Sequence, residues 1–436
     1  MAGKDTEQLL GDIYDFRSGL SKAGSEFGSG YPFLTFKDVF YNVFVPDKLG
    51  DLVNSTESER LNCDIKRGDV FLTRTSETMD ELGMSSVALR DIPLATFNGF
   101  TKRLRPKPDA KIVPEFAGYF FRSPQFRRDV TAMSSLSTRA SLNNDMLARL
   151  RIALPDLPVQ TAIGRTLKSL DEKVEQNHKT MRALEQLAQA LYRAWFVDFE
   201  PVKSKGGGAD CFPSMPQPVF DGLTTRLADS ELGLIPDGWS VEPLSNICTL
   251  VSGGTPKRSM PSYWDGDLPW YSVKDAPGYG EVWVIQTDER ITHDGLANSA
   301  ARMVPKGSTI ISARGTVGKL AMTGTTMAFN QSCYGLLPGD GISFGHLYLL
   351  MQTAVADLQQ RTHGSVFDTI TRATFDGLLV ISPPSDIVAA FEEVVSPLFE
   401  LILASRQESQ QLSELRDYLL PRLLSGSVHV ADAPHD

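Results

Sequence analysis

The 436-residue sequence is poor in the residues that build metal centres and covalent cross-links. It contains only six histidines, and its four cysteines, which show no CxxC spacing, are Cys63, Cys211, Cys248 and Cys333. Isolated cysteines argue against a structural zinc site and a disulfide framework, and they suit a reducing compartment. We therefore expect a cytoplasmic protein that holds no metal of its own.

Long apolar runs are also absent. No stretch approaches the roughly 18 apolar residues that a membrane span requires. The first residues, MAGKDTEQLLGD, lack both the basic and the apolar region of a signal peptide. The 42% hydrophobic content is nevertheless enough for ordinary buried cores. We expect two or three domains and no membrane contact.

Motifs of common enzyme sites are missing as well. The sequence has no GxSxG elbow and no HExxH pair, and GTVGKL (315–320) departs from the spacing of a phosphate-binding loop. One enzyme alternative stays open, because Pro155-Asp156 followed by Asp171-Glu172-Lys173 fits the pattern of a metal-dependent nuclease. The second run lies inside a helical heptad pattern, which favours solvent-facing charges over metal ligands.

The sequence contains the same unit twice. YPFLTFKD (31–38) resembles LPWYSVKD (268–275), and ATFNGFTKRLRP (95–106) resembles MAFNQSCYGLLP (327–338). The third match pairs residues 152–167 with 380–395, and the offset falls from 237 through 232 to 228, as differences in loop length would produce. We predict an α+β protein with two tandem α/β globules, each built on mixed sheets and each followed by a long helix.

Each predicted helix carries an apolar seam with alternating steps of four and three residues. Residues 159–197 alone would form a rod about 58 Å long. The seams carry polar residues at equivalent places, Asn177 and Ser405, which would fix the register of a helix pair. A chain that closes on itself must run the two helices antiparallel. The predicted spacer residues are Leu167, Leu170, Val174, Asn177, Met181, Leu184, Leu191, Val395, Leu398, Ile402, Ser405, Leu412 and Leu419.

The net charge of −10 argues at first against a nucleic-acid partner, but the charge is unevenly distributed. Residues 97–151 contain eleven basic and four acidic residues, a local charge of +7. Such segregation is typical of a surface that faces phosphates. GDVFLTR (68–74) also matches GSTIISAR (307–314) with a one-residue slip, which places Arg74 and Arg314 in similar turns.

Basic and amide side chains in these loops are suited to contacts with base edges and phosphates. The predicted DNA-binding residues are Arg74, Asn98, Lys102, Arg103, Arg105, Arg139, Lys257, Arg258, Lys274, Arg314, Lys319, Asn330, Gln331, Arg361, His363, Ser365 and Arg372. A coiled-coil assembly scaffold that binds no nucleic acid is a second alternative.

Several stretches resemble the specificity subunits of type I restriction-modification systems. They are IPDGWS and SGGTPKRS within residues 235–275, ISARGTVGKLA (311–321), FNQSCYGLLP (329–338) and YLLPRLLSG (418–426), and the resemblance extends over nearly the whole chain. It implies two target recognition domains that each read one half of a split double-stranded DNA site, with antiparallel helices setting the gap.

The resemblance also implies that this chain has no catalytic residues and no cofactor. Two modification subunits would carry S-adenosylmethionine and methylate a flipped adenine, and an ATP- and magnesium-dependent restriction subunit can join them. The predicted parts are a first target recognition domain (1–154), a first spacer helix (155–200), a connector (201–235), a second target recognition domain (236–383), a second spacer helix (384–426) and a tail (427–436).

Overall fold

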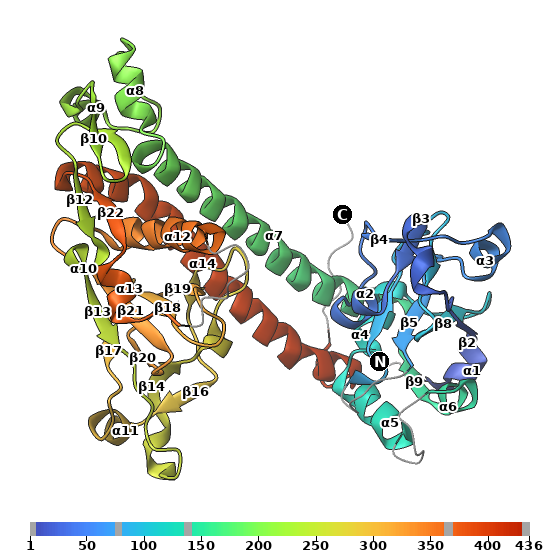
Figure 1. Ribbon diagram of the computed structural model, residues 1–436. Helices are drawn as coiled ribbons and strands as arrows, with labels where there is room; N and C mark the ends of the chain where they lie inside the picture. The colour runs from blue at the N-terminus through green and yellow to red at the C-terminus, as the bar shows by residue number, and fades with distance from the viewer. Residues whose placement is uncertain (1–5, 75–80, 135–141, 362–368, 430–436) are drawn as a thin grey trace. The chain divides into compact units, whose positions relative to one another are not determined.

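A computed structural model describes residues 6–74, 81–134, 142–361 and 369–429 of the chain. The chain divides into two compact units, of which the first comprises Met1–Lys173 with Gln411–Asp436 and the second comprises Val174–Gln410. Each unit contains one globule and parts of both long helices, α7 (Leu157–Phe196) and α14 (Ser385–Leu424), as Figure 1 shows. The predicted arrangement of two α/β globules with two long helices is confirmed.

The first globule is built on two small sheets. The main sheet has the order β2 (Tyr14–Ser18), β8 (Thr101–Pro106), β5 (Val70–Thr73) and β6 (Ser85–Val87). The second sheet has the order β4 (Asp51–Val53), β3 (Phe27–Leu34) and β7 (Thr96–Phe97), and a separate pair joins β1 (Thr6–Leu9) to β9 (Arg151–Leu154). The helices are α1 (Leu10–Ile13), α2 (Phe36–Tyr41), α3 (Glu57–Asn62), α4 (Pro114–Phe120), α5 (Pro124–Ser134) and α6 (Asn144–Arg149).

The second globule repeats this plan with longer sheets. Its main sheet has the order β13 (Cys248–Ser252), β21 (Cys333–Pro338), β18 (Thr309–Ser312), β19 (Leu320–Thr323) and β15 (Trp283–Val284). The second sheet has the order β16 (Glu289–Ile291), β14 (Trp264–Tyr271), β20 (Met327–Phe329) and β17 (Met303–Val304), and β12 (Ser240–Pro243) pairs with β22 (Leu379–Ser382). The helices are α10 (Leu244–Ile247), α11 (His293–Ala297), α12 (Phe344–Arg361) and α13 (Arg372–Asp376).

Alternation along the strands explains how each main sheet buries both faces. On β5, Val70 and Leu72 belong to the core shared with the helices, whereas Phe71 between them belongs to the core beneath the second sheet. On β18, Ile311 and Ile310 divide in the same way. Because successive strand residues point to opposite faces, short runs of consecutive apolar residues fill two cores at once.

The sequence match between residues 31–38 and 268–275 has a clear structural basis. Thr35 and Asp38 form a capping box at the start of α2, and Ser272 and Asp275 form one at the start of the short helix η4 (Val273–Asp275). Each box ends a strand that pairs in parallel with a later one, β3 with β7 and β14 with β20. The duplicated T/S-x-x-D pattern therefore marks the same strand-to-helix turn in both globules.

The two long helices run antiparallel and bury the predicted seams. Each contains 40 residues, a length of about 60 Å. In the second unit the Asn177 amide donates to the backbone oxygen of Ser405 (3.4 Å) and to Glu408 (2.7 Å), and the Trp195 and Phe391 rings lie 5.4 Å apart. All predicted spacer residues are buried or half-buried, so the coiled-coil prediction is confirmed.

The connector is more ordered than its glycines and prolines predict. It contains α8 (Glu200–Gly206), α9 (Gln217–Gly222) and the hairpin β10 (Leu227–Ser230) with β11 (Gly233–Pro236). Val202, Phe220 and Ile235 join the core of the second unit, because the aromatic end of α7 gives them an apolar surface to cover. Among the described helices, none is both long and apolar enough to cross a membrane.

Candidate nucleic-acid interface

In the second globule, four strand ends meet at one edge. Ser252 at the end of β13 pairs with Tyr334, and Ser312 at the end of β18 pairs with Cys333, the first residue of β21. The parallel pairing of β14 with β20 brings the end of β14 to the same place. The loops that leave these strands therefore gather at one edge, and they carry the exposed residues Lys257, Lys274, Arg314, Lys319 and Gln331.

The β18–β19 turn holds Arg314 and Lys319 on a fixed backbone. The buried Ser312 hydroxyl accepts a hydrogen bond from the Lys319 amide (2.8 Å) and also donates to the backbone oxygen of Thr316. Gly315 and Gly318 adopt positive φ angles of 75° and 85°, which tight turns require of glycine. Within the described residues, no carboxylate pairs with Arg314 or Lys319, so both charges face outward.

Two consecutive glycines anchor the loop after β13. A Cβ on Gly253 would lie 2.0 Å from the backbone oxygen of Asn330, and a Cβ on Gly254 would lie 2.3 Å from the backbone of Ala300. The loop that carries Lys257 is thus packed directly against the β20–β21 turn. The sequence analysis predicts no role for this pair, although adjacent glycines at a strand end are a known signal of close backbone approach.

Several predicted contacts in the second globule have partners inside the protein. Arg258 forms an ion pair with Glu289, and its guanidinium stacks 3.8 Å from the centre of the Trp264 ring. The Asn330 side chain accepts a hydrogen bond from the Ser332 amide (3.0 Å), as an asparagine does when it forms a turn. Arg372 donates to the backbone oxygen of Leu250 (3.2 Å). Their assignment to DNA stays a prediction.

The basic run on β8 of the first globule is engaged internally. Lys102 donates to Ser18 and to Asn144 at 2.8 Å each, and Arg103 pairs with Asp64 at 2.8 Å. Lys102 and Arg103 are only 8% and 6% exposed, and burial lowers the pKa of the Lys102 amine, with the charge of Arg74 as a second cause.

Arg105 completes this internal network. Its guanidinium donates two hydrogen bonds, of 2.7 and 2.6 Å, to the carboxylate of the fully buried Asp69, and it also forms an ion pair with Asp64 at 3.0 Å. Burial raises the pKa of Asp69, while the hydrogen bonds from Arg105 oppose that rise. Lys102, Arg103 and Arg105 therefore hold β8 to neighbouring loops, and their assignment to DNA stays a prediction.

The backbone register revises the match between the two arginine turns. The amide of Leu142 bonds to the backbone oxygen of Arg74, and the amide of Ile370 bonds in the same way to Ala313. Arg74 thus corresponds to Ala313, and Arg314 lies one residue further into its turn. The Asn98 side chain accepts from the Phe100 amide (2.6 Å), as Asn330 does from Ser332.

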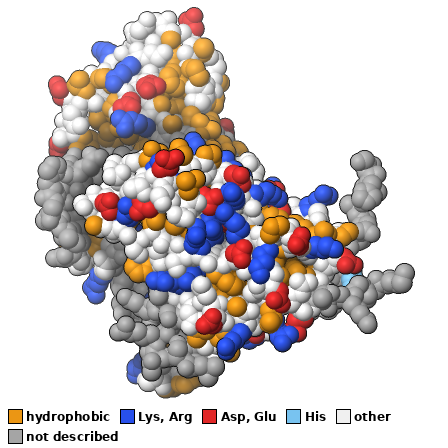
Figure 2. All heavy atoms as spheres, turned by 90° about the vertical axis from the view of Figure 1, so that its right-hand side faces the viewer, with side chains coloured by type: hydrophobic (Ala, Val, Ile, Leu, Met, Phe, Trp, Pro, Cys, Tyr) orange, Lys and Arg blue, Asp and Glu red, His pale blue; other side chains and the backbone are white. Residues whose placement is uncertain are grey.

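The structure does not describe the side chains of four predicted DNA-binding residues. Arg139, His363 and Ser365 lie outside the described residues, and the side chain of Arg361, the last residue of α12, is not described either. On the face drawn in Figure 2, Lys and Arg side chains are interspersed with Asp and Glu.

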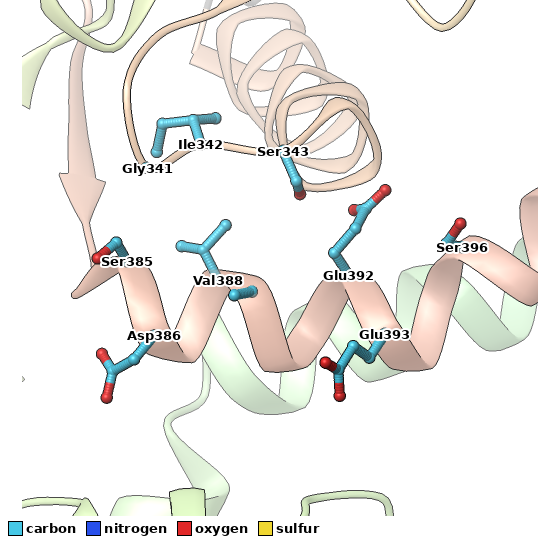
Figure 3. A pocket seen from close by; sticks show the side chains of 10 residues that line it. Gly341, Ile342, Ser343, Ser385, Asp386, Val388, Glu392, Glu393 and Ser396 are labelled. Atoms are coloured by element: carbon cyan, nitrogen blue, oxygen red, sulfur yellow. The ribbon is translucent and has the colours of Figure 1, made fainter.

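A hollow on α14 has the opposite electrostatic character. It has a volume of about 760 Å³, and its walls include Ile342, Val388, Asp386, Glu392 and Glu393. Figure 3 shows Val388 and Glu392 reaching toward the loop 341–343, while Asp386 and Glu393 point away from it. Its carboxylates would repel phosphates, which distinguishes this hollow from the edge that carries Lys257, Arg314 and Lys319.

The nuclease pattern does not form a metal site. Asp171 accepts hydrogen bonds from the Tyr119 hydroxyl (2.7 Å) and from Arg416 (2.6 Å), and Glu172 pairs with Lys168 on the same helix. No group of three or more His, Cys, Asp or Glu side chains within the described ranges could hold a metal ion. Asp171 instead joins α7 to Tyr119 of the globule and to Arg416 of α14.

Comparison with known proteins gives a consistent result. Residues 7–186 and 236–413 match the model of the type I restriction modification DNA specificity domain. The Haemophilus influenzae type I restriction enzyme HindI specificity subunit is 26% identical, covering 92% of this chain and 95% of its own length. The Methanocaldococcus jannaschii MjaIX specificity subunit is 23% identical over 97% and 92%. The M. genitalium S subunit structure shares the fold, with a TM-score of 0.59, 14% identity, and coverage of 97% and 99%.

Proposed function

The chain belongs to the type I restriction modification DNA specificity domain family, and from this premise we propose that each globule reads one half of a bipartite DNA site. The chain is a specificity subunit and not a catalytic one, as the two family matches and the named relatives indicate. It determines which DNA sequence a restriction-modification complex acts on. The nuclease and the DNA-free scaffold are not favoured.

The observation that carries the proposal is a duplicated fold in which the edges where the strand ends meet carry different charges. Both globules gather the same strand ends at one edge, but the charges that face outward there differ. In the second globule Lys257, Lys274, Arg314 and Lys319 are exposed, whereas Arg103 and Arg105 of the first globule are bound to Asp64 and Asp69. Equal scaffolds with unequal loops suit the reading of two different half-sites.

As a member of this family, the chain forms a complex with other subunits and DNA. The duplication suggests where two copies of one partner would bind. Leu187 on α7 and Leu415 on α14 are equivalent at the 228-residue offset, and they are 47% and 44% exposed. Two copies of one modification subunit docking over these leucines would explain why both are exposed. Those subunits would bind S-adenosylmethionine, and an additional restriction subunit would bind ATP and magnesium.

Domain exchange tests the proposal. We expect that replacing residues 1–150 with those of another family member changes one half of the methylated sequence and leaves the other half and the spacer unchanged. Sequencing of methylated adenines after reconstitution with the modification subunit measures this. A change in both halves, or in neither, would contradict modular reading. A second test uses the double variant Leu187→Asp, Leu415→Asp. It should remain folded but should no longer assemble with the modification subunits.

A further inference from the structure

The loop 277–281, between η4 and β15, joins the second globule to both long helices. Gln186 of α7 donates to the Tyr279 hydroxyl at 3.2 Å, and the Gly280 amide donates to the carboxylate of Glu185, also on α7. On the other side, Arg406 of α14 donates to Glu281 at 3.3 Å. Three consecutive loop residues thus contact two helices that the fold holds side by side.

Gly280 lets the loop lie directly on α7. Its φ angle is +84°, and a Cβ there would lie 2.2 Å from Cγ and 3.2 Å from Cα of Arg182. Both the backbone conformation and the available space therefore require glycine at this position. The loop backbone therefore packs directly against Arg182 of α7.

Glu185 extends the contact into the globule. Its side chain is only 7% exposed, and it accepts a hydrogen bond of 2.8 Å from Gln352 of α12. Burial raises the pKa of Glu185, and the bonds from Gln352 and Gly280 act in the opposite direction. A hollow of about 360 Å³ lies beside these groups, and its wall includes Lys319 of the β18–β19 turn. The Glu185 carboxylate therefore links α7 and α12 beside the hollow that Lys319 of the β18–β19 turn also lines.

The first globule has no equivalent arrangement among its described residues. Phe44 pairs with Val87 as Trp283 pairs with Met322, so the chain before Phe44 is the counterpart of the loop 277–281. There the backbone oxygen of Asn42 accepts from Arg122 at 2.9 Å, and Val43 accepts from the Val87 amide. These contacts stay within the globule.

We propose that Tyr279, Gly280 and Glu281 of the loop, with Glu185 and Arg406 of the helices, act as positioning residues that restrict the accepted distance between the two DNA half-sites. We call this set the clasp, and its role rests on the function proposed above. One added base pair moves a half-site by about 3.4 Å and turns it by about 35°. A globule held rigidly on its helices cannot follow that displacement, so the altered site binds poorly. A globule that can move on the helices follows part of the displacement and still binds.

The test compares spacer lengths. The methylated adenines of the wild-type complex first define the site, and duplexes are then made with the native spacer and with one base pair more or fewer. We expect Gly280→Ala to lower the ratio of methylation rates between native and altered spacers by about tenfold. Gly278→Ala is the matched control and should keep the ratio, because its Cβ would meet nothing nearer than Glu281 Oε2 at 3.8 Å.

The outcomes distinguish the two proposals. A wild-type complex that methylates no bipartite site would overturn the proposed function. Uniformly slower methylation in Gly280→Ala, with the spacer ratio unchanged, would overturn the clasp alone, since simple destabilisation slows all duplexes equally. If Gly280→Ala does not fold, Tyr279→Phe combined with Glu281→Gln removes the outer bonds only, and an unchanged ratio in that folded variant also overturns the clasp.

Discussion

The two units join globule to helix at equivalent places but with different chemistry. In the first, the Tyr119 hydroxyl of α4 donates to Asp171 of α7, which also accepts from Arg416 of α14. In the second, Tyr348 of α12 packs edge-on against Phe399 of α14, with ring centres 5.9 Å apart. At the 228-residue offset Phe399 is the counterpart of Asp171.

Duplication preserved the backbone and one aromatic ring at this junction, while the interacting groups diverged. A hydrogen-bonded junction depends on orientation and charge, whereas an apolar junction depends on buried area. Burial, reinforced by the charge of Asp171, raises the pKa of Tyr119, so its hydroxyl stays a donor. The first junction should therefore weaken in salt, and the second should not.

The largest effect is expected at the apolar junction. Phe399 is 3% exposed, and Phe399→Ala should lower the free energy of unfolding by about 4 kcal/mol through lost burial and a cavity. Urea unfolding of the full chain measures the change. Leu401→Ala, two residues along the helix and already 49% exposed, should cost much less. Similar losses in both variants would show that Phe399 is not a core contact.

A smaller loss is expected at the polar junction. Asp171→Ala leaves the Tyr119 hydroxyl and the Arg416 guanidinium without their shared acceptor, which should cost about 2 kcal/mol. The loss should shrink in high salt, as measured by urea unfolding at two ionic strengths. Glu172→Ala is the control, because its pair with Lys168 lies on the surface and should contribute little. Equal, salt-independent losses would contradict an electrostatic junction.

The sequence predicts the parts of this fold that repeat. The seam from Leu167 to Leu191 follows from heptad spacing, and its counterpart follows from the constant offset. The globules follow from matched segments such as TFKD and SVKD, which are the two capping boxes. Local patterns suffice here because helices, caps and repeats are local or periodic properties.

The candidate site could be predicted only in part, because charge partners are not local in sequence. Arg103 and Arg105 belong to a run with a charge of +7, but their partners Asp64 and Asp69 lie more than 30 residues upstream in another loop. Strand pairing creates these contacts, and a local charge count cannot reveal them. The exposed Arg314 and Lys319 were predictable, because a short glycine turn leaves its charged residues outside.

His346 adds a second difference between the junctions. It lies two residues before Tyr348 on α12, is 1% exposed, and has no hydrogen-bond partner on either ring nitrogen among the described residues. The Tyr192, Phe196 and Phe391 rings surround it, and the Glu392 carboxylate lies close to the neighbouring Gly345. In the first unit the residue two positions before Tyr119 is Ala117. Burial lowers the pKa of His346 from 6.5 to about 3.

The smallest effect follows from this buried ring. Between pH 6.5 and about 3 the unfolded chain binds a proton that the folded chain rejects. The free energy of unfolding should therefore fall with decreasing pH in this range, by at most about 1.4 kcal/mol per pH unit from this group. His346→Phe should remove that part of the slope in urea unfolding between pH 6.5 and 5. His293→Phe, at an exposed position, should keep it, and equal slopes in wild type and His346→Phe would show that His346 accepts its proton in the folded junction.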